Sequence, residues 1–361
     1  MKLSLSSDYS TPEHWRRVVE FAKQYDVDRL VFWGDSCTGR NKFSGFTPPF
    51  LYPEYPNLNG KIKDGYKEAI YRIRDYFKYA YQLTVDNGME FWYTFQVLQF
   101  PDVGFNSANA LKNVDFGPIK EIFPDLINQA GEIDMSQDFI YEFITNQVNE
   151  LFELAPELTG IELWVMERST VKIARLKQQK ISTGEILSKI VKTVRDNLKS
   201  RNCQLNIDLH TAGGETKTLF SLLDAARKYQ DVIVSADNTI GDYHLHLPFN
   251  QHLQKASRTN RVIVNFDLNG EYWGKNFVPT TAINQYEKHI EEARKINAKY
   301  INGRVATEND LSNPHVNVLP ARKKYYPGLE QISNSSVLDA CFRIPCLDTL
   351  TAFNAIYFCL K

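Results

Sequence analysis

Acidic residues stand at the points where three strand-like segments of this sequence end. Glu167 closes one apolar run, and Asp242 and Glu271 follow two later ones. Two opposed carboxyl groups can cleave a glycosidic bond, because one acid protonates the leaving oxygen while the other carboxylate activates water or attacks the sugar. Other polar and aromatic residues at such positions are candidates for substrate binding: Asp35, Trp33, Arg168, His210, Asp237, Tyr243, His244, Trp273 and Arg304.

These side chains can meet only if the segments that precede them run parallel and end on one face. Strand-like and helix-like runs alternate along the whole chain, and no repeat of fixed period interrupts them. Thr11 is suited to cap the first helix, with Pro12 at its first position. Eight strands are predicted, at residues 2–6, 29–34, 91–97, 160–166, 204–209, 232–235, 261–268 and 299–305, and the last of the intervening helices at 350–360.

This order predicts an α/β fold of the (β/α)8 TIM-barrel type, built as a single catalytic domain over residues 1–361. Long loops follow strand two (residues 35–63) and strand three (100–135). A doubly wound open sheet is the alternative, but no Gly-x-Gly-x-x-Gly follows the first strand. Right-handed crossovers place all strand ends at one mouth. We expect branched apolar side chains inside the barrel, so acids at the mouth point to function.

Composition excludes several classes of partner. The 361 residues carry 42 Lys and Arg against 43 Asp and Glu, a net charge of -1, which favours neither nucleic acid nor an anionic membrane. No run approaches the ~20 apolar residues that a bilayer requires. We expect a cytoplasmic protein, or a periplasmic one if a leader is removed, that binds a small carbohydrate; homodimerisation is left open. The five cysteines are scattered, so buried thiols are expected.

Three segments resemble the family 67 α-glucuronidases and related barrel glycoside hydrolases. The stretch from Asn265 to Lys275, with Glu271-Tyr-Trp-Gly near its end, resembles that family's strand-seven segment. Upstream, Asp242-Tyr-His-Leu-His-Leu-Pro248 matches an Asp-aromatic segment with Pro six residues after the Asp. The run from Leu158 to Glu167 resembles the strand that ends in the acid.

The resemblance implies an inverting hydrolase with Glu167 as general acid, while Asp242 and Glu271 hold or deprotonate the attacking water. Inverting enzymes separate acid and base by ~6.5 to 9.5 Å. Met166 precedes the acid where retaining relatives carry Asn, which favours inversion. The family binds the glucuronate carboxylate with Lys and Arg, yet Leu163 occupies one such position here. Arg168 or Arg304 can take that role, since a guanidinium matches a carboxylate.

Two other functions fit the same residues. A divalent-metal-dependent sugar isomerase or epimerase would use Glu167, His210, Asp237 and Glu271 as ligands, and His244-x-His246 could add imidazoles. A non-catalytic carbohydrate-binding barrel would keep the aromatic residues without a usable acid pair. Because all three proposed catalytic positions hold ionisable acids, we favour the hydrolase and assign no metal and no cofactor.

Overall fold

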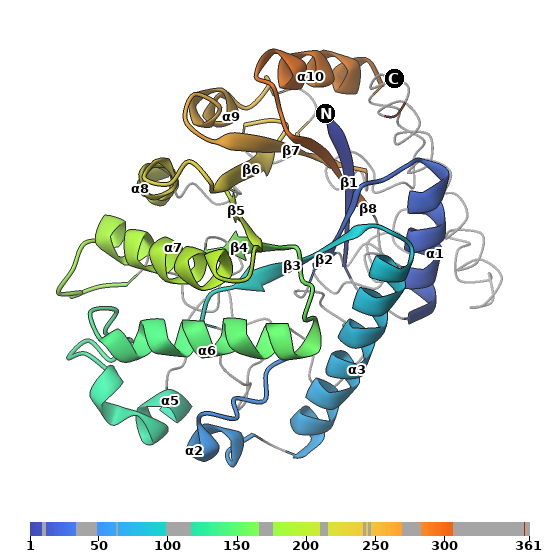
Figure 1. The fold of residues 1–361 in the computed structure, drawn as a ribbon. Coiled ribbons are helices and arrows are strands. Elements are labelled where there is room, and N and C mark those ends of the chain that lie inside the picture. Colours follow the sequence, from blue (N-terminus) through green and yellow to red (C-terminus); the bar gives the residue numbers. More distant parts are fainter. Residues whose placement is uncertain are drawn as a thin grey trace, which may run out of the picture.

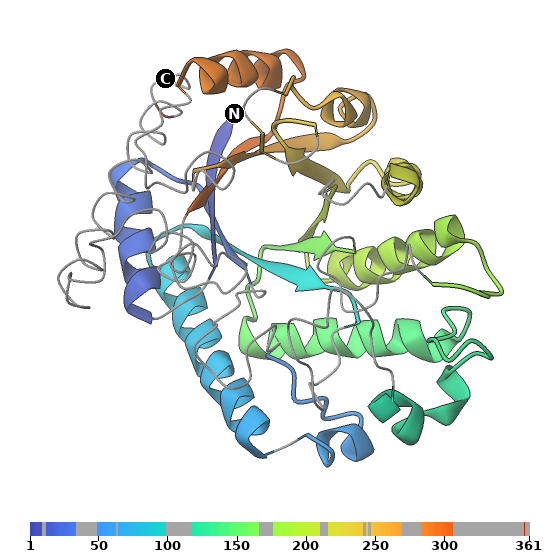
Figure 2. The same cartoon turned by 180° about the vertical axis from the view of Figure 1, so that it is seen from behind.

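The protein forms a closed barrel of eight parallel strands in the order β1 to β8, seen in a computed structural model (Figure 1). The predicted (β/α)8 fold is therefore confirmed. The structure describes residues 1–8, 12–33, 49–62, 64–98, 117–165, 176–209, 216–240, 243–244, 247–268, 283–305 and 357. Helices surround the strands on the outside, as the view from behind also makes clear (Figure 2).

The strands are β1 (Lys2–Asp8), β2 (Arg29–Trp33), β3 (Glu90–Gln96), β4 (Gly160–Trp164), β5 (Gln204–Asp208), β6 (Ile233–Asp237), β7 (Arg261–Asp267) and β8 (Tyr300–Val305). The bounds of the strands agree with the predicted ones to within about two residues. Where a predicted strand extends into residues outside the described ranges, that end is not compared. The helices are α1 (Pro12–Gln24), α2 (Pro56–Asn59), α3 (Asp64–Asp86), α5 (Gly117–Ile122), α6 (Asp138–Leu154), α7 (Thr183–Lys199), α8 (Thr216–Arg227), α9 (Gln251–Ala256) and α10 (Ile283–Lys295), with a 3-10 turn at Pro124–Leu126.

Local sequence explains several of the helix ends. Ser182 caps α7 with a capping box, in which its hydroxyl accepts from the Glu185 amide and the Glu185 carboxylate accepts from the Ser182 amide. Asn250 caps α9 by accepting from the His252 amide. Beyond α3, Gly88 takes a φ of 76°, a left-handed conformation that glycine adopts readily. None of the described helices has both the length and the apolar character that crossing a membrane requires.

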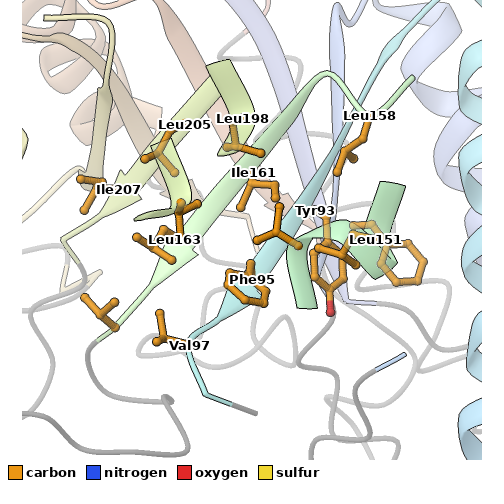
Figure 3. Close-up of a cluster of buried hydrophobic side chains, with 14 of the residues drawn as sticks. Tyr93, Phe95, Val97, Leu151, Leu158, Ile161, Leu163, Leu198, Leu205 and Ile207 are labelled. Carbon is orange, nitrogen blue, oxygen red and sulfur yellow. The ribbon is translucent and has the colours of Figure 1, made fainter. Parts of the chain in front are cut away.

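The main hydrophobic core lies between the sheet and the helices. Alternate residues of the strands face outward, because successive side chains of a strand point to opposite faces. Figure 3 shows part of this layer, where Leu163, Ile161 and Leu205 of the sheet lie near Leu151 and Leu198 of the helices. Cys203 is buried as a free thiol, and burial raises its pKa to about 12. This agrees with the expected buried thiols; the other cysteines lie outside the described residues.

Part of the long loop after β2 packs firmly against the outside of the barrel. The ring of Tyr52 stacks on Phe143 of α6 at 5.6 Å between centroids. Glu150 of the same helix accepts hydrogen bonds from the backbone amides of Leu51 and Tyr52 at 2.7 and 3.2 Å, and it pairs with Arg74. The aromatic residues in this part of the loop therefore belong to the core. The short helix α2 is also part of this loop.

The interior of the barrel differs from the expected apolar filling. A small apolar cluster is present, formed by Val31, Trp92, Ile233, Ile263 and Tyr300. Beside it lies a set of buried, hydrogen-bonded polar side chains from all eight strands, which we call the interior belt. Its members are Ser4, Ser6, Arg29, Thr94, Glu162, Asn206, Asp208, Ser235, Asn265 and Asn302.

One arm of the interior belt runs from β2 through β1, β8 and β7. Arg29 Nε donates to Ser4 Oγ at 2.7 Å, and Ser4 Oγ donates to Asn302 Oδ1 at 2.7 Å. Asn302 Nδ2 then donates to Asn265 Oδ1 at 3.1 Å, and Asn265 Nδ2 donates to Asp208 Oδ2 at 3.0 Å. These hydrogen bonds satisfy much of the hydrogen-bonding capacity of this arm.

The other arm runs from β3 through β4, β5 and β6 to the same carboxylate. Thr94 Oγ1 and Asn206 Nδ2 donate to the two oxygens of Glu162, at 3.4 and 3.0 Å. Asn206 Nδ2 also lies 2.8 Å from Ser235 Oγ, which in turn donates to Asp208 Oδ2 at 2.8 Å. Both arms therefore end at Asp208.

Gly160 of β4 allows the barrel to close tightly around Trp92. A methyl group at Gly160 would lie 2.3 Å from the Trp92 ring, which real side chains do not tolerate. We expect Gly160→Ala to lower the free energy of unfolding by ~1–3 kcal/mol through overpacking. Urea denaturation measures this. Gly184→Ala in α7, where the nearest atom is 3.9 Å away, is the control and should be neutral or slightly stabilising; equal effects of both changes would contradict the prediction.

His289 of α10 makes stability depend on pH. Its ring nitrogens lie 2.9 and 2.8 Å from the side-chain amides of Asn238 and Gln285, and burial lowers its pKa to about 4. The unfolded chain takes up a proton near pH 6.5, but the folded chain does so only near pH 4, so stability falls as pH drops through this window.

We expect His289→Gln to lose the pH dependence that His289 causes, because glutamine does not titrate. As pH falls from about 7 to about 4, the free energy of unfolding should therefore decrease more for the wild type than for the variant. Urea denaturation across that range measures it. Because His252, whose pKa is also lowered by burial, is present in both proteins, it cancels in the comparison. A difference that stays constant with pH would contradict the prediction.

Candidate functional site at the mouth of the barrel

The last inward-facing residues of the strands form the base of the mouth. Trp33 ends β2 and Trp164 ends β4, while Asp208, Asp237 and Asp267 end β5, β6 and β7. Arg304 stands one residue before the end of β8, at the same edge. In (β/α)8 barrels this C-terminal face carries the active site. The described part of the mouth is therefore acidic and aromatic.

Trp33, Trp164 and Arg304 pack together across the barrel. The rings of Trp33 and Trp164 meet edge to face, with centroids 5.2 Å apart, although β3 lies between their strands. The guanidinium carbon of Arg304 lies 4.6 Å from the centroid of the Trp33 ring, again across an intervening strand. These contacts confirm that all three side chains point inward. A cation on an indole face is attracted by the ring and held in position.

Tyr243, in the loop after β6, lies close enough to the mouth charges to be affected by them. It is buried, and burial raises the pKa of its phenol well above the usual value. The nearby carboxylates of Asp237, Asp208 and Asp267 raise it further, and the Arg304 cation partly opposes them. The phenol therefore stays protonated and can act as a hydrogen-bond donor.

The base of this loop is pinned to the sheet. Asn250 Nδ2 donates to the carbonyl oxygens of Asp237 and Thr239 at 3.0 and 3.2 Å. Thr239 and Phe249 form an antiparallel bridge, and the Asn238 amide donates to the Asn265 carbonyl at 2.8 Å. The two ends of the segment that contains Asp242 are thus fixed beside β6 and β7.

The sequence candidates divide into two groups. Trp33, Asp237, Tyr243 and Arg304 are buried around the mouth, and His244 is half-buried beside Tyr243. The three proposed catalytic acids, Glu167, Asp242 and Glu271, lie outside the described residues, and their roles stay predictions. The roles of four binding candidates also stay predictions, because Asp35, Arg168, His210 and Trp273 lie outside the described residues as well.

Register fixes the direction of three residues in β2 and β4. Phe32, which precedes Trp33, faces outward and packs on Trp15, with ring centroids 5.2 Å apart. Leu163 also faces outward, so a lysine there would point away from the mouth. Glu162 faces inward and lies buried in the interior belt, where the Arg29 cation is its largest opposing charge.

Sequence reasoning assigned no role to Trp164, Asp208 or Asp267. Each of the three is the last residue of its strand, and each lies an even number of positions from the other inward-facing residues of that strand. Strict alternation counted back from the strand ends would have found them. The metal hypothesis is not tested, because His210, His246, Glu167 and Glu271 are not described; among the described residues, no group of His, Cys, Asp and Glu is arranged to hold a metal ion.

Comparisons with known proteins bear on the fold. No protein-family model matches the sequence, and no curated protein matches it. Among solved structures, the chain is similar to a GH138 enzyme targeting pectin rhamnogalacturonan II, with 10% identity and a TM-score of 0.51 over 85% of this chain and 35% of that one.

It is also similar to the chitobiase of Flavobacterium johnsoniae, with 10% identity and a TM-score of 0.51 over 98% of this chain and 52% of that one. An inactive mutant of a GH20 exo-β-N-acetylglucosaminidase from Vibrio harveyi gives 10% identity and a TM-score of 0.50 over 97% and 54%. The chain spans about a third to a half of the length of these proteins. At this level of identity the likeness establishes a (β/α)8 barrel of the same kind.

Proposed function

We propose that this protein is a glycoside hydrolase. The observation that carries the proposal is the mouth itself: a parallel barrel whose strand ends bring aspartates, two tryptophans and an arginine to one face. Carboxyl groups beside flat aromatic faces suit the cleavage of sugar linkages. The likeness to a GH138 enzyme, a chitobiase and an exo-β-N-acetylglucosaminidase supports the same reaction class.

In this proposal Glu167 donates a proton to the leaving oxygen, and Asp242 and Glu271 orient and deprotonate the attacking water. Glu167 comes three residues after β4, which ends at Trp164, while Asp242 and Glu271 follow the neighbouring strands β6 and β7. Acid and base then approach the sugar from different parts of the rim, as inverting and retaining hydrolysis both require, and inversion rests on the resemblance and on Met166 before the acid. Tyr243, which stays protonated, can donate a hydrogen bond to a sugar hydroxyl from the same loop as Asp242.

For the substrate we propose an oligosaccharide that contains a uronic acid. Arg304 is the described cation of the mouth, and its guanidinium, held on the Trp33 ring, is suited to bind a carboxylate. Arg168 is a second candidate for that contact. The alternative is a neutral sugar, and one observation favours it: three aspartates end strands at the same mouth, and one of them, Asp267, is paired in register with Arg304.

We expect Glu167→Gln, Asp242→Asn and Glu271→Gln each to lower kcat by at least ~100-fold, because each removes a proton-transfer group while keeping the shape of the side chain. Assays on aldobiouronic acids and aryl glycosides measure kcat, and NMR of the first-formed anomer tests inversion. Glu153→Gln on the exposed side of α6 is the control and should keep full activity. Near wild-type turnover of any one variant would remove that residue from its role.

We expect Arg304→Met to separate the two substrate classes. If Arg304 binds a uronate, kcat/KM for a uronosyl substrate should fall by ~10-fold or more, while the matched neutral glycoside changes little, since a charge-assisted hydrogen bond contributes more than a neutral one. Steady-state kinetics on the substrate pair measures the ratio. Equal losses on both substrates would contradict carboxylate recognition by Arg304 and favour a neutral substrate.

The metal-dependent isomerase remains distinguishable by experiment. Its activity would disappear with EDTA and return with Mn²⁺, because the divalent ion would orient the sugar oxygens. Release of a free sugar that is insensitive to EDTA would favour the hydrolase. An unaltered carbohydrate recovered after long incubation would instead support a binding barrel.

A further inference from the structure

The interior belt is continuous around the barrel except at one place. Its two arms share Asp208 as their common end, but their other ends, Arg29 on β2 and the Thr94–Glu162 pair on β3 and β4, are not joined by any hydrogen bond within the described residues. Along the neighbouring strands β2 and β3, Arg29 pairs with Glu90 and Thr94 pairs with Trp33, so the two ends stand at different heights of the wall. Glu162 is nevertheless the largest opposing charge on Arg29, which places the guanidinium near that carboxylate. The opening is therefore a local feature of the barrel interior.

Unpartnered polar atoms belong to the same part of the belt. Both terminal nitrogens of Arg29, Nη1 and Nη2, are buried and have no hydrogen-bond partner among the described residues. Asn206 Oδ1, on the residue that donates to Glu162, is likewise buried without a partner. Neither residue has any exposed surface. Buried donors and acceptors without partners are costly, and internal water commonly satisfies them.

The surroundings of Arg29 prevent a simple side-chain rearrangement. Its guanidinium carbon lies 4.4 Å from the ring centroids of both Trp92 and Tyr300, and Nε is held by Ser4 Oγ. With two aromatic rings packed against the guanidinium and Nε bonded to Ser4, Nη1 and Nη2 are the atoms left to hydrogen-bond. Those atoms need acceptors that the neighbouring rings cannot provide.

Charge and hydrogen-bond polarity identify the chemical class of the ligand. Arg29 is opposed chiefly by the charge of Glu162, with a further contribution from Glu90, so the site has no excess positive charge to attract an anion. An anion would accept from Arg29 but could not donate to Asn206 Oδ1. Water can do both, because it accepts from one group and donates to the other.

We propose that ordered water inside the barrel accepts hydrogen bonds from Arg29 Nη1 or Nη2 and donates to Asn206 Oδ1 and the Glu162 carboxylate, closing the interior belt. The belt then forms an unbroken circuit through all eight strands. Its bridging water connects the arm that contains the buried cation with the arm that contains the buried carboxylate, and both arms hold Asp208 at the mouth.

A crystal structure of the full chain, at a resolution that reveals ordered water, tests the proposal directly. We expect density for water at ~2.7–3.2 Å from an Arg29 Nη atom and, directly or through a second water, from Asn206 Oδ1. A direct Arg29–Glu162 ion pair, or an interior without density at this place, would overturn it. A bromide soak should give no anomalous signal there. A bromide peak at this place would show that the site binds an anion rather than water and would overturn the proposal.

A solution measurement gives an independent result. Oxygen-17 magnetic relaxation dispersion reports long-lived internal water, and we expect Arg29→Met to lose at least one such molecule relative to wild type. Arg261→Met is the matched control, because Arg261 starts β7 at an exposed position and should leave the count unchanged. An unchanged count in folded Arg29→Met would refute the assignment. If that variant does not fold, the wild-type crystal and bromide experiments decide the question alone.

Discussion

Closure of eight parallel strands into a barrel is the constraint on which the rest of this structure depends. Successive residues of each strand must face either the surrounding helices or a narrow interior that no loop or helix can reach. Outward positions are mostly apolar, with Ser7 of β1 as a polar exception, and they build the main core with the helices. Inward positions carry arginine, glutamate, asparagine and serine, and the hydrogen bonds that they make to one another offset much of the cost of burying them.

The interior belt links the depth of the barrel to its mouth. Arg29 lies between aromatic rings inside the barrel. From there a chain of hydrogen bonds runs to the end of β5 through Arg29, Ser4, Asn302, Asn265 and Asp208, in that order. Removing one member would leave its neighbours buried without partners, which costs more than an isolated surface bond. Such a network favours one arrangement of side chains and so presents Asp208 in a defined position.

The mouth combines this rigid base with charges that act at short range. Arg304 rests on the Trp33 ring, and Tyr243 is kept protonated by burial and by the aspartates at the ends of β5, β6 and β7. Charged groups held by packing and by hydrogen bonds need little rearrangement when a polar substrate binds, which is the condition for effective electrostatic stabilisation in catalysis. The acids proposed for catalysis follow β4, β6 and β7 in the chain.

The sequence by itself determined the fold, because alternating strand-like and helix-like runs leave few topologies and the strands are strongly apolar on one face. It also placed Trp33, Asp237 and Arg304 at strand ends. It did not reveal the polar interior: nothing local distinguishes Asn265, which faces inward, from a polar residue at a loop. Glu162 could be assigned to a buried face by alternation, but not to a network with Arg29, whose position is remote along the chain.

Only the tertiary structure decided which polar residues meet. Trp33 and Trp164 are 131 residues apart in the sequence, yet their rings are in contact. They meet because closure of the barrel turns the inward side chains of β2 and β4 toward the same narrow interior. Phe32 and Leu163 look equally close to the mouth in sequence but turn outward, since a shift of one residue exchanges the two faces of a strand. Local patterning specifies elements; contacts between distant elements follow from the closed geometry of the sheet.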